Sequence, residues 1–76
     1  MTPSQYTYLD QLARGVLETG DGSTLAGLST GERCYVALAA SRVDLLPAGY
    51  GIAGAAARLE PSELVELLKR WHQASR

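Results

Sequence analysis

Three helix-start motifs divide this 76-residue chain and restrict it to a helical fold. They are Thr2-Pro3-Ser4-Gln5, Ser29-Thr30-Gly31-Glu32 and Glu60-Pro61-Ser62-Glu63. In the first two, a hydroxyl can accept a hydrogen bond from the amide three residues later, and the side chain of that later residue can reach back. In the first and third, a proline occupies the first helical position, which it favours. No segment alternates apolar and polar residues for long enough to predict a strand.

The residues after the first motif have helical periodicity. With about 100° per residue, apolar side chains collect on one side of a helix and polar ones on the other. Tyr8 lies about 160° from Tyr6 on this wheel, so we expect it at the exposed rim. The predicted inward side holds Tyr6, Leu9, Leu12, Ala13, Val16 and Leu17, and the outward side holds Asp10, Gln11, Arg14 and Glu18. The segment Gly20-Asp21-Gly22-Ser23 then ends the helix and opens a loop.

The second motif precedes the most apolar part of the chain. Residues from Arg33 to about Ser41 are apolar nearly all round, which is typical of a buried central helix. Residues 42–50 contain Pro47 and Gly49 and predict a turn with room for one helical turn.

Two further helices are predicted after this turn. Ile52 to Leu59 forms a short, alanine-rich helix, and the last helix pairs Glu66 with Arg70 one turn later. The inward stripe of the last helix is Leu64, Val65, Leu67, Leu68 and Trp71. We therefore predict an all-α fold, a compact bundle of four short helices that forms one domain over residues 1–76.

Composition limits where such a chain can work. With 46% hydrophobic residues it is too apolar for a disordered tail, yet no apolar run approaches membrane-spanning length. The first residues lack the basic and apolar regions of a signal peptide. Cys34, the one cysteine, cannot form an internal disulfide. We expect a cytoplasmic protein with no membrane partner.

The residues needed for catalysis are scarce. His72 is the one histidine, and we expect it to place a favourable charge on the last helical turn. We expect Cys34 to be a buried core residue, because it lies in the most apolar helix. No glycine segment matches a phosphate-binding loop. We therefore expect no enzyme, no cofactor and no metal site.

Charge is spread unevenly along the chain. Residues 1–32 hold four acidic residues against Arg14, a balance of −3, and residues 33–76 hold six basic against four acidic residues, a balance of +2. The total of −1 makes direct nucleic-acid binding unexpected. The acidic first helix would instead attract a basic partner.

A helix-turn-helix regulator is one alternative. Residues 51–70 have the order of features of that motif, a helix of small residues, a short turn and a second helix. Glu60, however, occupies the turn position where glycine is usual. Glu63 and Glu66 would lie on the exposed face of the second helix and repel phosphate. An assembly protein that oligomerises through its alanine-rich helix is the other alternative.

The opening Gln5-Tyr6-Thr7-Tyr8, the acidic amphipathic helix that follows it, and Leu28-Ser29-Thr30-x-Glu32 resemble small helical anti-CRISPR proteins of phages and mobile elements. The resemblance covers about the first half of the chain and is to the kind directed at type I-E interference complexes. It implies a stoichiometric inhibitor that sits on a basic, nucleic-acid-handling surface of a host defence complex. From the resemblance, the contact candidates are Tyr8, Asp10 and Glu18.

The acidic first helix predicts a slightly larger contact surface. It consists of Tyr8, Asp10, Arg14 and Glu18, and it continues toward Asp21. A competing site is the basic end of the last helix, Lys69-Arg70-Trp71-His72, although we expect Trp71 itself to fill the core. The sequence predicts neither the identity of the partner nor the number of copies that assemble.

Overall fold

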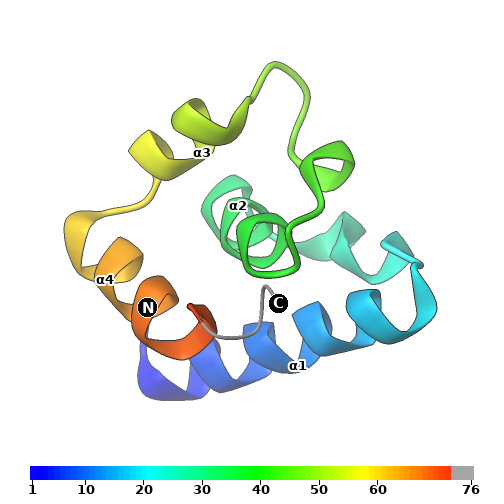
Figure 1. Ribbon diagram of the computed structural model, residues 1–76, viewed down its shortest axis with the longest axis horizontal. Helices are drawn as coiled ribbons and strands as arrows, with labels where there is room; N and C mark the ends of the chain where they lie inside the picture. Colours follow the sequence, from blue (N-terminus) through cyan, green and yellow to red (C-terminus); the bar gives the residue numbers. More distant parts are fainter. Residues whose placement is uncertain (73–76) are drawn as a thin grey trace.

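A computed structural model describes residues 1–72, and within them every regular element is a helix (Figure 1). This confirms the predicted all-α class and the four short helices. The elements are α1 (Pro3–Thr19), η1 (Ser23–Gly27), α2 (Thr30–Ala39), η2 (Val43–Leu45), α3 (Ile52–Arg58) and α4 (Pro61–Trp71), where η denotes a 3-10 helix. The single helical turn predicted within residues 42–50 is η2, whereas η1 was predicted as loop.

The caps form as their residue types predict. Thr2 Oγ1 accepts a 3.2 Å hydrogen bond from the Gln5 amide, and Gln5 Oε1 accepts one of 2.8 Å from the Thr2 amide. Ser29 and Glu32 make the same reciprocal pair at the start of α2. Gly20 ends α1 with φ of 75°, a left-handed conformation that glycine adopts without steric cost.

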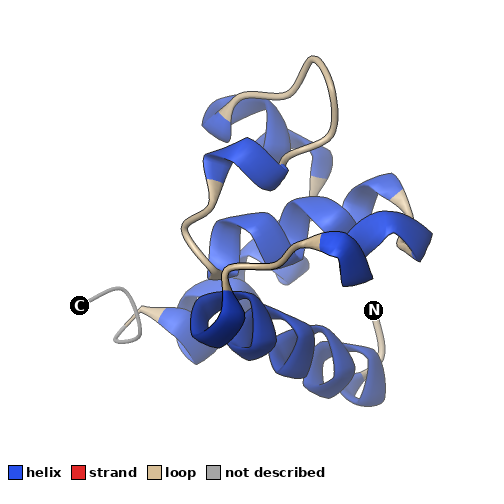
Figure 2. Cartoon of the chain, turned by 90° about the vertical axis from the view of Figure 1, so that its right-hand side faces the viewer, coloured by secondary structure: helices blue, strands red, loops and turns tan. Residues whose placement is uncertain are grey.

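The helix α2 is the centre of the fold, as its apolar sequence predicts. Contacts with α1, α3, α4 and η2 surround it, and α1 and α3 lie on opposite sides of it in both views (Figures 1 and 2). Five of its ten residues are buried, Cys34, Tyr35, Val36, Ala37 and Ala39. Burial raises the pKa of the Cys34 thiol, in keeping with its predicted place in the core.

Three side chains predicted to point inward are half exposed instead. Leu17, Val65 and Leu68 have exposed fractions of 50%, 50% and 62%. The apolar arc of α4 is wider than the side that packs against the rest of the fold, so only Leu67 and Trp71 are buried. Within residues 1–72, no helix is long and apolar enough to cross a membrane.

Candidate protein-interaction surfaces

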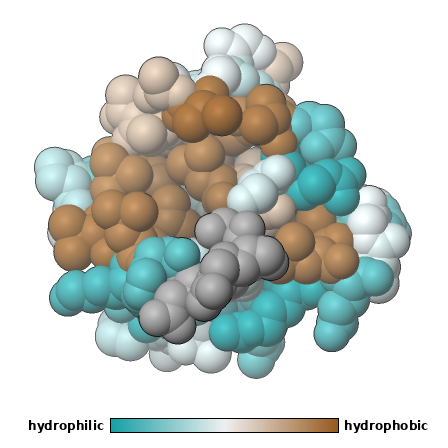
Figure 3. All heavy atoms as spheres, in the orientation of Figure 1, coloured by the Kyte–Doolittle hydropathy of each residue, from teal (hydrophilic) through white to brown (hydrophobic). Residues whose placement is uncertain are grey.

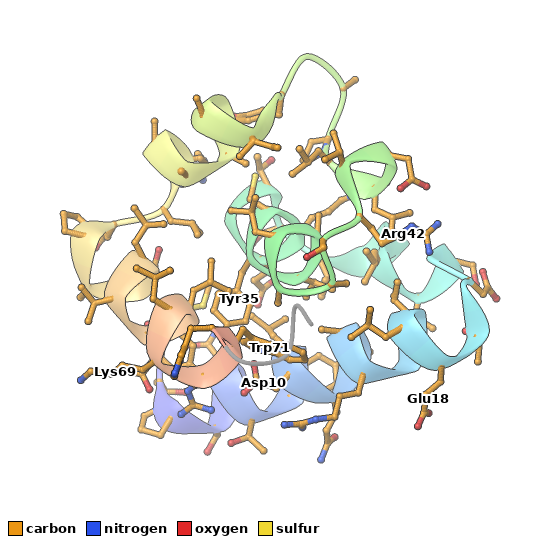
Figure 4. The ribbon with its side chains drawn as sticks, viewed as in Figure 1. Asp10, Glu18, Tyr35, Arg42, Lys69 and Trp71 are labelled. Carbon is orange, nitrogen blue, oxygen red and sulfur yellow. The ribbon has the colours of Figure 1, made fainter. Side chains whose placement is uncertain are left out.

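The carboxylate of Asp10 lies in the core, so the prediction that it faces outward is wrong. Asp10 is 5% exposed, and its side chain lies where α1, α2 and α4 meet (Figure 4). Asp10 Oδ1 accepts hydrogen bonds from the Tyr35 hydroxyl at 2.8 Å and from Trp71 Nε1 at 2.7 Å. Oδ2 accepts a third from Arg70 at 2.9 Å. A buried charge needs such compensation, and a carboxylate used in this way is not exposed to contact a partner.

Arg70 neutralises this carboxylate and is itself held by three groups. Its guanidinium also donates to Glu66 Oε2 at 2.8 Å and lies 5.0 Å from the centre of the Tyr6 ring. The hydrogen bonds that Arg70 donates to Glu66, and next to Asp10, raise its pKa. Burial, and next the hydrogen bond to Asp10, raises the pKa of Tyr35. Arg70 is thus part of the tertiary packing.

The basic end of α4 therefore offers less charge than its sequence indicates. Trp71 is buried, as predicted, and Arg70 is bound to two carboxylates. Lys69 points away from the fold (Figure 4), and His72 Nδ1 lies 2.9 Å from the Leu68 carbonyl oxygen. Among residues 69–72, Lys69 is the basic side chain that remains outside an ion pair.

The remaining predicted contact residues occupy different positions around α1. Tyr8 is 54% exposed, and Glu18 points away from the molecule (Figure 4). The Arg14 guanidinium lies 5.4 Å from the centre of the Trp71 ring, so it covers the end of α4. Asp21 lies in the loop after α1, where hydrogen bonds from the amide and hydroxyl of Ser23 lower its pKa.

Gly15 lies on the exposed side of α1 near Tyr8, where no contact residue was predicted. It follows Tyr8 by seven residues, which places both on the same side of α1. A Cβ atom added at Gly15 would meet no neighbouring atom within 4 Å. Glycine inside a helix costs about 1 kcal/mol relative to alanine, and packing among the described residues does not explain that cost. We call this surface the outer face of α1 and define it by Tyr8, Gln11, Gly15 and Glu18.

A second surface lies at the carboxyl end of α2 and was missed by sequence reasoning. Two hollows, of about 270 and 180 Å³, lie on either side of Leu38, which is only partly buried. Apolar side chains gather on this side of the molecule (Figure 3). We call it the α2-end face and define it by Leu38, Val43, Leu46, Ile52 and Leu68. The periodicity of α4 could not reveal it, because a wide apolar stripe does not say which part is covered.

The helices of the alternative DNA-binding motif are present, but their surfaces differ from the prediction. Glu63 forms a 3.5 Å ion pair with the amino group of Met1, and Glu66 forms one with Arg70. Both carboxylates are therefore paired within the fold. The exposed residues of α4 instead include Ser62, Val65 and Lys69. A single lysine beside an apolar side chain is a weak phosphate-binding surface.

Among residues 1–72, no three histidine, cysteine, aspartate or glutamate side chains are grouped so as to hold a metal ion. Every buried polar side-chain atom in that part of the chain has a hydrogen-bond partner. No protein-family model, curated protein or solved structure matches the chain.

Proposed function

We propose that this protein is a small stoichiometric inhibitor that binds a host defence complex through the outer face of α1. The observation that carries the proposal is Gly15, which weakens α1 without a packing reason among residues 1–72. A glycine on the same side of a helix as an exposed aromatic side chain lets the backbone of a partner approach the helix closely. The partner would be a protein complex of the kind indicated by the anti-CRISPR resemblance, met in the cytoplasm.

The residues of this face would have separate roles. Tyr8 combines a large apolar ring with a hydroxyl, and such side chains often dominate binding energy at interfaces. Glu18 and Asp21 are exposed carboxylates that would speed association with a basic surface. Asp10 has no direct role, because its carboxylate is occupied inside the fold.

The test is a titration of the purified protein into a purified type I-E CRISPR interference complex, with target DNA binding as the readout. We expect DNA binding to fall until the protein reaches a fixed molar ratio to the complex, and then to stay low. Direct capture of labelled protein by the immobilised complex should saturate at the same ratio. Undiminished DNA binding, together with no capture at a large molar excess, would reject the proposed target.

A further inference from the structure

The α2-end face is an apolar surface with no cover among residues 1–72. Val43, Ile52 and Leu68 are 54%, 59% and 62% exposed, and they surround the partly buried Leu38. Exposed apolar side chains that gather in one place mark interaction sites more often than scattered ones do. None of the residues that define the outer face of α1 lines either hollow.

This face carries both a projecting side chain and a place to receive one. Leu68 projects from α4 on one side of Leu38. On the other side, Val43, Leu46 and Ile52 line the hollow of about 270 Å³. Because an apolar cavity of about 150 Å³ can hold benzene, this hollow has room for the four carbons of a leucine side chain.

We propose that a second copy of this chain covers the α2-end face through a two-fold axis close to Leu38. In a two-fold contact the same patch is used by both copies, so each contact occurs twice. Leu68 of each copy would enter the hollow beside Val43 and Ile52 of the other. The assignment does not depend on the function proposed for α1.

The charges around the face favour a copy of the chain over a strongly charged partner. Arg42 donates two hydrogen bonds of 2.9 Å to Asp44, so the rim beside η2 is close to neutral. Lys69, on the α4 side, forms no ion pair with a carboxylate of the described residues. One such cation is too little to hold a nucleic acid. The formal net charge of −1 also means that two copies repel each other weakly.

The surface area that two copies could bury sets the expected affinity of the dimer. The described chain exposes 4546 Å². An interface that covered a tenth of it on each copy would bury about 900 Å² in total, below the roughly 1,200 Å² of standard stable complexes. We therefore expect a weak dimer whose population depends on concentration.

The experiment is sedimentation velocity on the full chain between about 10 µM and about 1 mM, a range suited to weak association. The weight-average mass should rise from 8.1 kDa toward twice that value. Leu68→Glu should raise the concentration needed for half-dimerisation by more than about tenfold, because a carboxylate would enter the apolar hollow. Leu17→Glu is the matched control, because Leu17 is a half-exposed leucine on α1 that lines neither hollow. Circular dichroism melts show whether each variant is folded.

A mixing experiment tests the two-fold geometry directly. Val43→Lys should also weaken the dimer, since it places an ammonium group in the same hollow. Mixed in equal amounts, the Leu68→Glu and Val43→Lys chains should form a heterodimer by native mass spectrometry, because one contact becomes an ion pair and the other stays unchanged. A monomeric parent chain throughout the range, larger open assemblies, or a dimer that Leu68→Glu leaves intact would each overturn the proposal.

Discussion

Trp71 donates a 2.7 Å hydrogen bond from its indole nitrogen to Asp10 Oδ1, which joins the first and last helices across 61 positions of the chain. The same oxygen accepts from Tyr35 of the central helix, and Arg70 binds the other oxygen. One carboxylate therefore holds α1, α2 and α4 together. In so small a domain the apolar core contributes little surplus stability, so this network has a large relative effect.

Asp10→Ala should lower the free energy of unfolding by about 3–5 kcal/mol, because it leaves two buried donors without their acceptor and removes one of the two carboxylates that bind Arg70. Urea denaturation followed by circular dichroism measures this loss. Glu18→Ala, which removes an exposed carboxylate from the same helix, should change the value by less than about 0.5 kcal/mol. Equal effects of the two variants would mean that Asp10 contributes no more than a surface residue.

Stability should fall at high pH, in part because of Tyr35. Burial raises its pKa above the ordinary value of 10.0, so the folded chain keeps a proton that the unfolded chain loses. The stability that Tyr35 contributes through its raised pKa is fully present below pH 10 and is lost as the pH rises beyond that value. In urea denaturation between about pH 9 and pH 11, the decline should be shallower for Tyr35→Phe than for the parent. Cys34 and Tyr6, whose pKa values are also raised, contribute to the decline that remains in the Tyr35→Phe variant. An equally steep decline of stability with pH in the parent and in Tyr35→Phe would contradict the role assigned to Tyr35.

The sequence predicted features that depend on neighbouring residues in the chain. The caps at Thr2 and Ser29 and the apolar run of α2 are local, and the structure confirms them. Which side of a helix is covered depends instead on helices that are distant in sequence. Asp10 looked external on the wheel because its partners lie 25 to 61 positions away. Leu68 looked internal for the same kind of reason, since its apolar neighbours on α4 do not reveal where the packing ends.

Two leucines test this distinction between periodicity and packing. Leu9 is completely buried, so Leu9→Ala should cost about 2–5 kcal/mol by leaving a cavity. Leu38 belongs to the most apolar helix but lines two open hollows, so Leu38→Ala should cost less than Leu9→Ala. Chemical denaturation of the two variants under the same conditions gives the comparison. A larger loss for Leu38→Ala would show that the hollows beside it are closed in solution.

Gly15→Ala should have opposite effects on the stability of the fold and on binding. Gly15→Ala should raise the free energy of unfolding by roughly 0.5–1 kcal/mol, because alanine is the better helix former and its methyl group meets no neighbour. The same methyl group should weaken binding to the defence complex if the partner approaches closely. Gly54→Ala in α3 is the matched control, since a Cβ there makes only ordinary contact with Tyr50 at 3.7 Å. It should stabilise the fold and leave binding unchanged. Equal effects of the two variants on binding would remove Gly15 from the contact surface.

Binding kinetics on the immobilised type I-E complex test the outer face of α1 most directly. Tyr8→Ala should weaken binding by about 1–3 kcal/mol, mainly through faster dissociation. Glu18→Lys should slow association and reduce its dependence on salt concentration. The control carries Ala53→Lys and Ala57→Lys on exposed positions of α3, which gives the same change in net charge on another helix. We expect the α1 variants to lose binding in these two distinct ways, while the α3 control binds like the parent. Parental kinetics for both α1 variants would contradict this expectation.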